Sequence, residues 1–325
     1  MRAIRCHSFG LPDQLKLEDI PDPAPGQGQA LIAVEACGLG FVDGLLVQGK
    51  YQLKDPLPFT PGGEMAGRVI AVGPGAPADL VGKRVAVIAK GGLAEKAVVP
   101  AAACTILPDG FDTAAAASAI INYGTAIYGF EDCGRLKAGE TVLVLGASGG
   151  VGMAAIDVAR GLGAFVIAAA SSEDKRQAAL ARGAHAAVDY TQADWRKALE
   201  AALAGKGLDV VYDPVSGAWS EAAFRSLAPG GRHLVIGFAS GEIAKLPLNL
   251  ALLKRASLLG VDWGGHVRAH AAEGPRLNRR FVELTAAGKI SPRADSVHGL
   301  AEAPAVLTAM LARKMIGKPV IDPRR

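Results

Sequence analysis

Four glycines lie close together in the stretch Thr141–Gly152, whose sequence is TVLVLGASGGVG. Its first five residues are apolar or β-branched, as in a buried parallel strand, and apolar residues at helical spacing follow the glycines. A strand, a glycine turn and a helix bind dinucleotides, because the backbone can approach a pyrophosphate whose charge faces free helix amides. We therefore predict a dinucleotide site, with a tight turn lacking a ligand as the alternative. The predicted contacts are Ala147, Ser148, Gly149, Gly150 and Val151.

Hydroxyl and cationic side chains follow the next apolar run, FVIAAA at 165–170. In the NAD-binding form of this motif, a carboxylate at the end of the second strand binds the ribose diol. Here Ser171 and Ser172 stand at that point, and Lys175 and Arg176 come one helical turn later. Hydroxyls with a cation are the groups that bind a 2′-phosphate. The sequence favours NADPH held by Ser171, Ser172 and Lys175; an exposed helix face solvated by the two cations is the alternative.

Candidate metal ligands are sparse. The cysteines form no CxxC pair and lie far apart, so we expect free, buried or partly buried thiols at Cys6, Cys37, Cys104 and Cys133. His266 and His270 have the i,i+4 spacing of two ligands on one helix face. Without a third ligand nearby, we expect this pair to be solvated.

The glycine turn opens a regular alternation of strands and helices. We predict strands at Thr141–Leu145, Phe165–Ala169, Ala186–Asp189, Leu208–Tyr212, Arg232–Ile236 and Ser257–Val261. Helices are expected at Val151–Gly161, Glu173–Arg182, Gln192–Ala204 and Ala218–Ala228. Six strands with crossover helices make a doubly wound parallel sheet of the α/β class. Phe238 and Ala239 follow its fifth strand, so we expect them to line the nicotinamide side at the carboxyl end of the sheet.

The first 123 residues are short apolar runs separated by Pro and Gly, which predict a β-rich, partly open barrel. Strands are expected at Ala30–Ala36, Arg68–Val72, Arg84–Ala89 and Ala94–Val99, and a helix over 113–130 marks the domain boundary. The alternation ends after about Gly264. The elements expected to return to the β-rich domain are a helix near Leu277–Ala287, a strand near Arg293–Ser296, a helix at Ala301–Ala312 and a strand at Pro319–Ile321. The predicted domains are 1–123 with 265–325, and 124–264.

Composition excludes several classes of protein. The 325 residues carry a formal net charge of only +4, spread along the chain, so no nucleic-acid or membrane-surface footprint is expected. No apolar run reaches the roughly 18 residues of a spanning helix, and the N-terminus lacks the apolar core of a signal peptide. We expect a soluble, cytoplasmic protein.

These elements and several longer motifs resemble the medium-chain dehydrogenase/reductase superfamily, and within it the zinc-independent NADPH:quinone oxidoreductase (zeta-crystallin-like) branch. The resemblance covers essentially the whole chain. It rests on GKYQ at 49–52, LPFTPGGEMAGRV at 57–69, YGTA at 123–126, GASGGVG at 146–152, SSEDK at 171–175, DVVYDPV at 209–215, GGRHLVIGFASGEI at 230–243 and GK at 317–318. It implies a GroES-like catalytic domain, a Rossmann NADPH-binding domain and a cofactor in the cleft between them.

The resemblance also bears on zinc. Zinc-containing members carry a cysteine ligand where this chain has Gly40 and a histidine where it has Gly63, and their four-cysteine structural cluster is missing here. Glycine has no ligand atom, so we expect no catalytic zinc. The zinc-independent branch usually has Asn at the position of Gly40, near the nicotinamide and the acceptor. Its loss leaves space there and favours a bulkier or different acceptor.

Further roles are implied by the matched motifs. Thr125 would lie by the nicotinamide and bond its carboxamide, or satisfy its own helix backbone. Tyr51 resembles a pocket residue whose phenol donates to a developing enolate or quinol oxygen, although packing alone is the alternative. Asp43 matches a family Asp on the helix that follows a strand. It is a candidate catalytic residue, and a structural cap of that helix is the alternative. Tyr190 would lie near the adenosine phosphate, and Lys318 would face the cofactor cleft.

The resulting prediction is an NADPH-dependent, zinc-independent reductase that transfers hydride to a quinone or an α,β-unsaturated carbonyl. One alternative is an enoyl- or haloacrylate-type reductase of an activated C=C bond. Another is an NADPH-binding sensor protein with low turnover. The resemblance implies a homodimer through the nucleotide domain, and an exposed edge strand at Ser257–Val261 offers a route to it.

Overall fold

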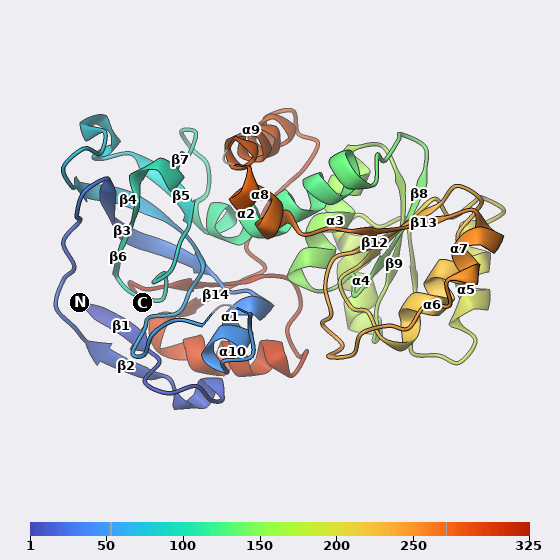
Figure 1. The fold of residues 1–325 in the computed structure, drawn as a ribbon, viewed down its shortest axis with the longest axis horizontal. Coiled ribbons are helices and arrows are strands. Elements are labelled where there is room, and N and C mark those ends of the chain that lie inside the picture. The colour runs from blue at the N-terminus through green and yellow to red at the C-terminus, as the bar shows by residue number, and fades with distance from the viewer. Residues whose placement is uncertain (53, 271) are drawn as a thin grey trace. The chain divides into compact units, whose positions relative to one another are not determined.

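Two units make up the computed structural model, which describes residues 1–52, 54–270 and 272–325. Unit 1 consists of Met1–Ile121 and Pro292–Arg325, and unit 2 of Asn122–Ser291 (Figure 1). Helix α2 (Thr113–Ile127) contributes residues to both. None of the helices in the described ranges is long and apolar enough to cross a membrane.

Unit 1 is built on strands. A seven-stranded sheet has the order β14-β15-β3-β4-β5-β7, with β6 paired to β3, and β1 and β2 form a separate hairpin. The strands are β1 (Arg2–Arg5), β2 (Lys16–Asp19), β3 (Gln29–Gly38), β4 (Glu64–Val72), β5 (Arg84–Ile88), β6 (Lys96–Pro100), β7 (Thr105–Ile106), β14 (Ser296–Gly299) and β15 (Pro319–Asp322). The helices are α1 (Phe41–Val47), α10 (Ala303–Leu311) and the 3-10 turns η1 (Pro12–Gln14), η2 (Ala78–Leu80), η3 (Ala101–Ala103) and η5 (Leu300–Glu302).

The C-terminal strand of unit 1 returns to the N-terminal sheet. β15 pairs antiparallel with β3, so the last residues of the chain complete a sheet that starts near its beginning. The pairing of β3 with β4 shifts register twice, between Leu31 and Ile32 and between Val34 and Ala36. Such shifts bend the strands, which suits a partly open barrel. Alternate residues of β3 are buried, because one face of the strand packs on the core.

Unit 2 is a parallel sheet with the strand order β10-β9-β8-β11-β12-β13. The strands are β8 (Thr141–Leu145), β9 (Phe165–Ala169), β10 (Ala186–Val188), β11 (Val210–Asp213), β12 (Arg232–Val235) and β13 (Ser257–Gly260). The helices are α3 (Gly150–Gly161), α4 (Glu173–Arg182), α5 (Trp195–Leu203), α6 (Ala218–Arg225), α7 (Asn249–Lys254), α8 (Trp263–Ala269), α9 (Glu273–Ala286) and the π-helical η4 (Tyr128–Cys133). Every residue of β8 is buried, as its apolar sequence predicts. The predicted α/β fold, a Rossmann-type sheet with a β-rich domain, is confirmed.

The second predicted domain boundary differs from the one observed. The sequence analysis placed 265–325 with the β-rich domain, whereas residues up to Ser291 belong to unit 2. The reason is the packing of α9. Arg280 pairs with Glu131 at 2.6 Å, and the Phe281 ring meets Tyr123 edge-on at 5.5 Å. An amphipathic pattern reveals that α9 has a buried face but not what covers it.

The short helices α7 and α8 were not predicted, because six or seven residues show too little periodicity. The four cysteines are free thiols, as expected, and Cys6 and Cys37 are buried.

Candidate functional site

The glycine turn has the geometry of a phosphate cradle. Gly146 has φ +57°, and a Cβ at Gly152 would lie 2.4 Å from the Gly146 carbonyl oxygen, so the fold itself requires both glycines. A Cβ at Gly149 would meet, among the described residues, the Gly146 oxygen alone within 4 Å, at 3.6 Å. Protein packing therefore explains two of the glycines, while the open space beside Gly149 fits the approach of a ligand. The predicted contacts lie in this turn or in the first two residues of α3: Ala147, Ser148, Gly149, Gly150 and Val151.

A buried carboxylate organises the neighbouring loop at the carboxyl end of β11. Asp213 Oδ1 accepts hydrogen bonds from the amides of Val215 at 2.9 Å and Ser216 at 2.8 Å. Its Oδ2 accepts from Ser220 Oγ at 2.5 Å and lies 3.0 Å from His233 Nε2. Burial raises the pKa of Asp213, but these hydrogen bonds and the His233 charge outweigh it and hold that pKa below its ordinary value.

This loop contacts the glycine turn. A Cβ at Gly146 would lie 2.6 Å from Val215 Cγ2, so the two loops touch. The segment after β12 is attached as well, because the Ala239 amide donates to the Pro214 carbonyl at 3.1 Å. Phe238, one residue earlier, is 48% exposed. The sequence motif indicated no role for Asp213. Its partners Ser220 and His233 lie 7 and 20 residues away, and only the fold brings them to its carboxylate.

The predicted 2′-phosphate residues lie at the end of β9. Lys175 Nζ is 3.4 Å from Ser171 Oγ, so a cation and a hydroxyl are side by side. Arg176, by contrast, forms ion pairs with Glu173 at 2.7 Å and Asp189 at 2.9 Å. Two carboxylates of unit 2 therefore engage the Arg176 guanidinium.

Other predicted nucleotide residues are spread over unit 2. Ser172 is the N-cap of α4, and its side chain makes no capping bond to the described residues. The Tyr190 ring packs edge-on against Trp219 at 4.9 Å. Thr125 is partly buried in the second half of α2.

In unit 1, Asp43 is a buried structural cap of α1. Its Oδ2 accepts from the Gly40 amide at 2.7 Å and its Oδ1 accepts from the Gly63 amide at 3.0 Å. Burial raises the pKa of this carboxyl. The amides of Gly40 and Gly63, the two glycines that the sequence analysis considered in place of zinc ligands, therefore both donate to one carboxylate. In the described part of the chain, no group of three or more His, Cys, Asp or Glu is arranged to hold a metal ion.

Lys318 is also buried in unit 1. Its ammonium lies 2.8 Å from Glu64 Oε2, and Glu64 Oε1 accepts from the Ile121 amide at 2.9 Å. Burial raises the pKa of Glu64, and the Lys318 charge opposes that rise. Tyr51 is partly buried just after α1, and the structure does not bring it to Asp43 by a hydrogen bond among the described residues.

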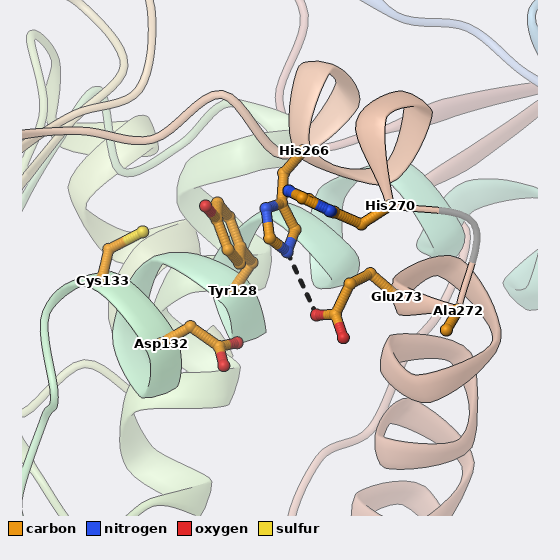
Figure 2. A pocket seen from close by; sticks show the side chains of 7 residues that line it. All are labelled: Tyr128, Asp132, Cys133, His266, His270, Ala272 and Glu273. Carbon is orange, nitrogen blue, oxygen red and sulfur yellow. Dashed lines mark hydrogen bonds and ion pairs between the residues drawn. The ribbon is translucent and has the colours of Figure 1, made fainter.

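His270 is exposed, as expected for a solvated pair, and His266 is partly buried. They line a cavity of unit 2 together with Tyr128, Asp132, Cys133, Ala272 and Glu273 (Figure 2). His266 Nε2 lies 3.1 Å from Glu273 Oε2. No sequence signal joins Tyr128 to His266, because 138 residues separate them and only packing brings them together.

Comparison with known proteins identifies the family. The family model described as "Alcohol dehydrogenase GroES-like domain" matches residues 26–109, and "Zinc-binding dehydrogenase" matches 150–276. The chain is 34% identical to quinone oxidoreductase-like protein 2 of Rattus norvegicus over 99% of its length and 92% of the relative. No described arrangement of ligands corresponds to the zinc in the second family's description.

Two solved structures share the complete fold. A mycobacterial protein solved in complex with NADPH has a TM-score of 0.90 at 32% identity, covering 99% of this chain and 100% of the other. Escherichia coli quinone oxidoreductase complexed with NADPH has a TM-score of 0.88 at 25% identity, with coverage of 99% and 100%. Family models match both the N-terminal and the C-terminal part of the chain, and relatives align along its full length. The chain belongs to the quinone oxidoreductase-like branch of the medium-chain dehydrogenase/reductase superfamily.

Proposed function

We propose that this enzyme is an NADPH-dependent reductase that passes hydride to a quinone or an α,β-unsaturated carbonyl compound. The observation that carries the choice of NADPH is the juxtaposition of Ser171 and Lys175 at the end of β9. Strand β9 pairs in parallel with β8, so their carboxyl ends lie at the same edge of the sheet as the glycine turn. The two solved relatives that contain NADPH support this choice.

The chain's own groups bind and orient the reactants in this proposal. Bound NADPH supplies the hydride from its nicotinamide ring. The first amides of α3 face the pyrophosphate, and Ser171, Ser172 and Lys175 hold the 2′-phosphate. The Thr125 hydroxyl bonds the carboxamide, and the Tyr51 phenol donates to the oxygen on which charge develops. The remaining proposed cofactor contacts are Tyr190, Phe238, Ala239 and Lys318.

The proposed reaction uses no zinc. The support comes from residue chemistry, because Gly40 and Gly63 provide no ligand atom. The neighbouring Asp43 carboxylate has both oxygens engaged by backbone amides.

We also propose a homodimer through the edge of the parallel sheet. β13 is an edge strand, and the adjacent α7 displays apolar side chains. Leu252 is 79% exposed, Leu253 69% and Leu258 51%. An edge strand flanked by exposed leucines is a surface that a second copy can cover by strand pairing and apolar burial.

The assay that tests the enzyme proposal follows NADPH oxidation with 1,4-naphthoquinone, with an enone and with no acceptor, and repeats each with NADH. Turnover that requires an acceptor and prefers NADPH is expected. Turnover of the enone but not of the quinone would instead indicate an enoyl- or haloacrylate-type reductase of activated C=C bonds. Tight NADPH binding without any turnover would overturn the proposal in favour of a sensor protein.

A further inference from the structure

One buried carboxyl group in unit 2 has no part in the reaction described above. Asp157 lies in the second half of α3 and is 9% exposed. The residues around it in the helix are apolar and no more than 2% exposed: Ala154, Ala155, Ile156, Val158 and Ala159. A polar group in such surroundings needs hydrogen-bond partners, because burial removes it from water. Its partners therefore show what this side chain holds in place.

Two donors meet at one oxygen of Asp157. The Tyr123 hydroxyl donates to Asp157 Oδ2 at 2.7 Å, and the Ser291 amide donates to the same oxygen at 2.8 Å. Tyr123 is the second residue of unit 2, and Ser291 is its last. Asp157 therefore ties the first and the last segment of unit 2 to α3, the helix that follows the glycine turn.

The bond from Tyr123 holds helix α2 against α3 (Figure 1). The Tyr123 side chain is buried, and its ring packs edge-on against Phe281 at 5.5 Å. The next residue, Gly124, admits the Trp263 indole, because a Cβ at this glycine would lie 3.0 Å from the ring. Contacts at two successive residues fix the rotation of α2 about its own axis.

Thr125 follows on the other side of this helix. With 3.6 residues per turn, residues two apart are separated by about 200° around the axis. Thr125 is accordingly partly exposed, whereas Tyr123 is buried. The direction of the Thr125 side chain therefore depends on the rotation that the bond between Tyr123 and Asp157 helps to fix.

We propose that Asp157 is a positioning residue for the nicotinamide: by holding Tyr123, it sets the direction in which Thr125 meets the carboxamide. The inference rests on the proposed function, which assigns the carboxamide to Thr125. The pyrophosphate binds at the start of α3 and the carboxamide at α2. Because both groups belong to one molecule, the two helices must keep a fixed geometry for both contacts to form. The buried bond between Asp157 and Tyr123 supplies that link.

Binding of two nucleotides to the full chain tests this role. NADPH carries the nicotinamide, whereas adenosine 2′,5′-bisphosphate keeps the 2′-phosphate and lacks that ring. Tyr123→Phe removes one hydroxyl and keeps the aromatic ring. Calorimetry should show that this variant binds NADPH about fivefold more weakly and the bisphosphate as wild type does. Tyr128→Phe is the matched control in η4, because its hydroxyl bonds Cys133 instead, and it should change neither affinity.

Substitutions of the carboxyl group provide a second pair of variants. Asp157→Asn keeps an oxygen that can accept from both donors, whereas Asp157→Ala keeps none. We expect Asp157→Ala to weaken NADPH as Tyr123→Phe does, and Asp157→Asn to restore most of the affinity. Unchanged binding of the bisphosphate shows in each case that unit 2 is folded.

A double-mutant cycle shows whether the effect passes through Thr125. Thr125→Val removes the proposed carboxamide contact, so Tyr123→Phe added to it should weaken NADPH no further. Additive effects in this cycle would overturn the positioning role. Equal weakening of NADPH and the bisphosphate by Tyr123→Phe would overturn it too, because a general structural role affects both nucleotides.

Turnover separates this inference from the reductase. Initial rates with 1,4-naphthoquinone and with an enone are measured for wild type and for the same variants. The expected binding pattern without any turnover would refute the reductase and leave the positioning role of Asp157 standing. NADPH-dependent turnover with additive effects in the cycle would refute the positioning role and leave the reductase standing.

Discussion

The Lys318 ammonium lies 2.8 Å from Glu64 Oε2, although the two residues are 254 positions apart. Both side chains are buried, with exposures of 6% and 1%. Lys318 directly precedes β15, and Glu64 begins β4, so this pair joins the end of the chain to the N-terminal sheet. The Asp43 charge acts on the same group of residues, and the ammonium compensates two buried carboxylates.

Lys318→Met should therefore destabilise the protein. Removing one partner leaves buried carboxylates uncompensated, which costs about 3–5 kcal/mol of the free energy of unfolding. Urea unfolding measures the loss, and Lys314→Met, an exposed lysine four residues away, is the control. Unchanged stability with a higher KM for NADPH would contradict this structural role and leave Lys318 only the cofactor contact proposed above.

Asp213 should stabilise unit 2 in a pH-dependent way. Its pKa in the folded state lies below the ordinary value of an Asp carboxyl, so its contribution to stability is complete above that ordinary pKa and is lost as the pH falls through the folded pKa. Asp213→Asn should cost about 2 kcal/mol at neutral pH, because bonds to a buried charge are lost. It should also flatten the acid limb of a stability-against-pH curve.

The control is Asp194→Asn, because Asp194 is an exposed residue of unit 2. This substitution should leave the curve of stability against pH unchanged. An acid limb of the same shape in wild type and Asp213→Asn would show that Asp213 does not titrate with unfolding.

Lys175→Ala should raise KM for NADPH about tenfold to hundredfold and leave KM for NADH nearly constant, since a charged hydrogen bond contributes about 1.5–3 kcal/mol. Arg176→Ala is the matched control on the same helix, because Glu173 and Asp189 already hold that guanidinium. Initial rates with both cofactors supply the comparison. Equal effects of Lys175→Ala on the two cofactors would contradict a 2′-phosphate contact.

Zinc should be absent from the active protein. Elemental analysis of the purified enzyme is expected to find far less than one zinc per chain, and dialysis against EDTA should leave its rate unchanged. Glycines at positions 40 and 63 give the physical reason. A stoichiometric metal whose removal abolishes turnover and whose return restores it would reverse this conclusion.

The edge of β13 should control assembly. Leu252→Glu combined with Leu258→Lys places two charges on the exposed apolar surface and should convert a dimer into single chains of 33.3 kDa. Light scattering after gel filtration reports the mass. Leu11→Lys, at another exposed leucine in unit 1, should leave the mass as in wild type.

The nucleotide half of the site was largely predictable from the sequence. Strands β8 and β9 and helix α4 begin and end at the predicted residues, because local periodicity and glycine placement determine such elements. Ser171 and Lys175 are also local, four residues apart across the start of one helix, so their proximity follows from helical geometry.

Packing decided the rest. The sequence by itself determined the strand, glycine turn and helix of the nucleotide motif, and that Gly40 and Gly63 bring no ligand. Only the tertiary structure joined Lys318 to Glu64, His233 to Asp213 and Tyr128 to His266. The tertiary structure also showed that α9 belongs to unit 2. The physical reason is that local patterns record which face of an element is buried, whereas the partner on that face depends on how distant segments pack together.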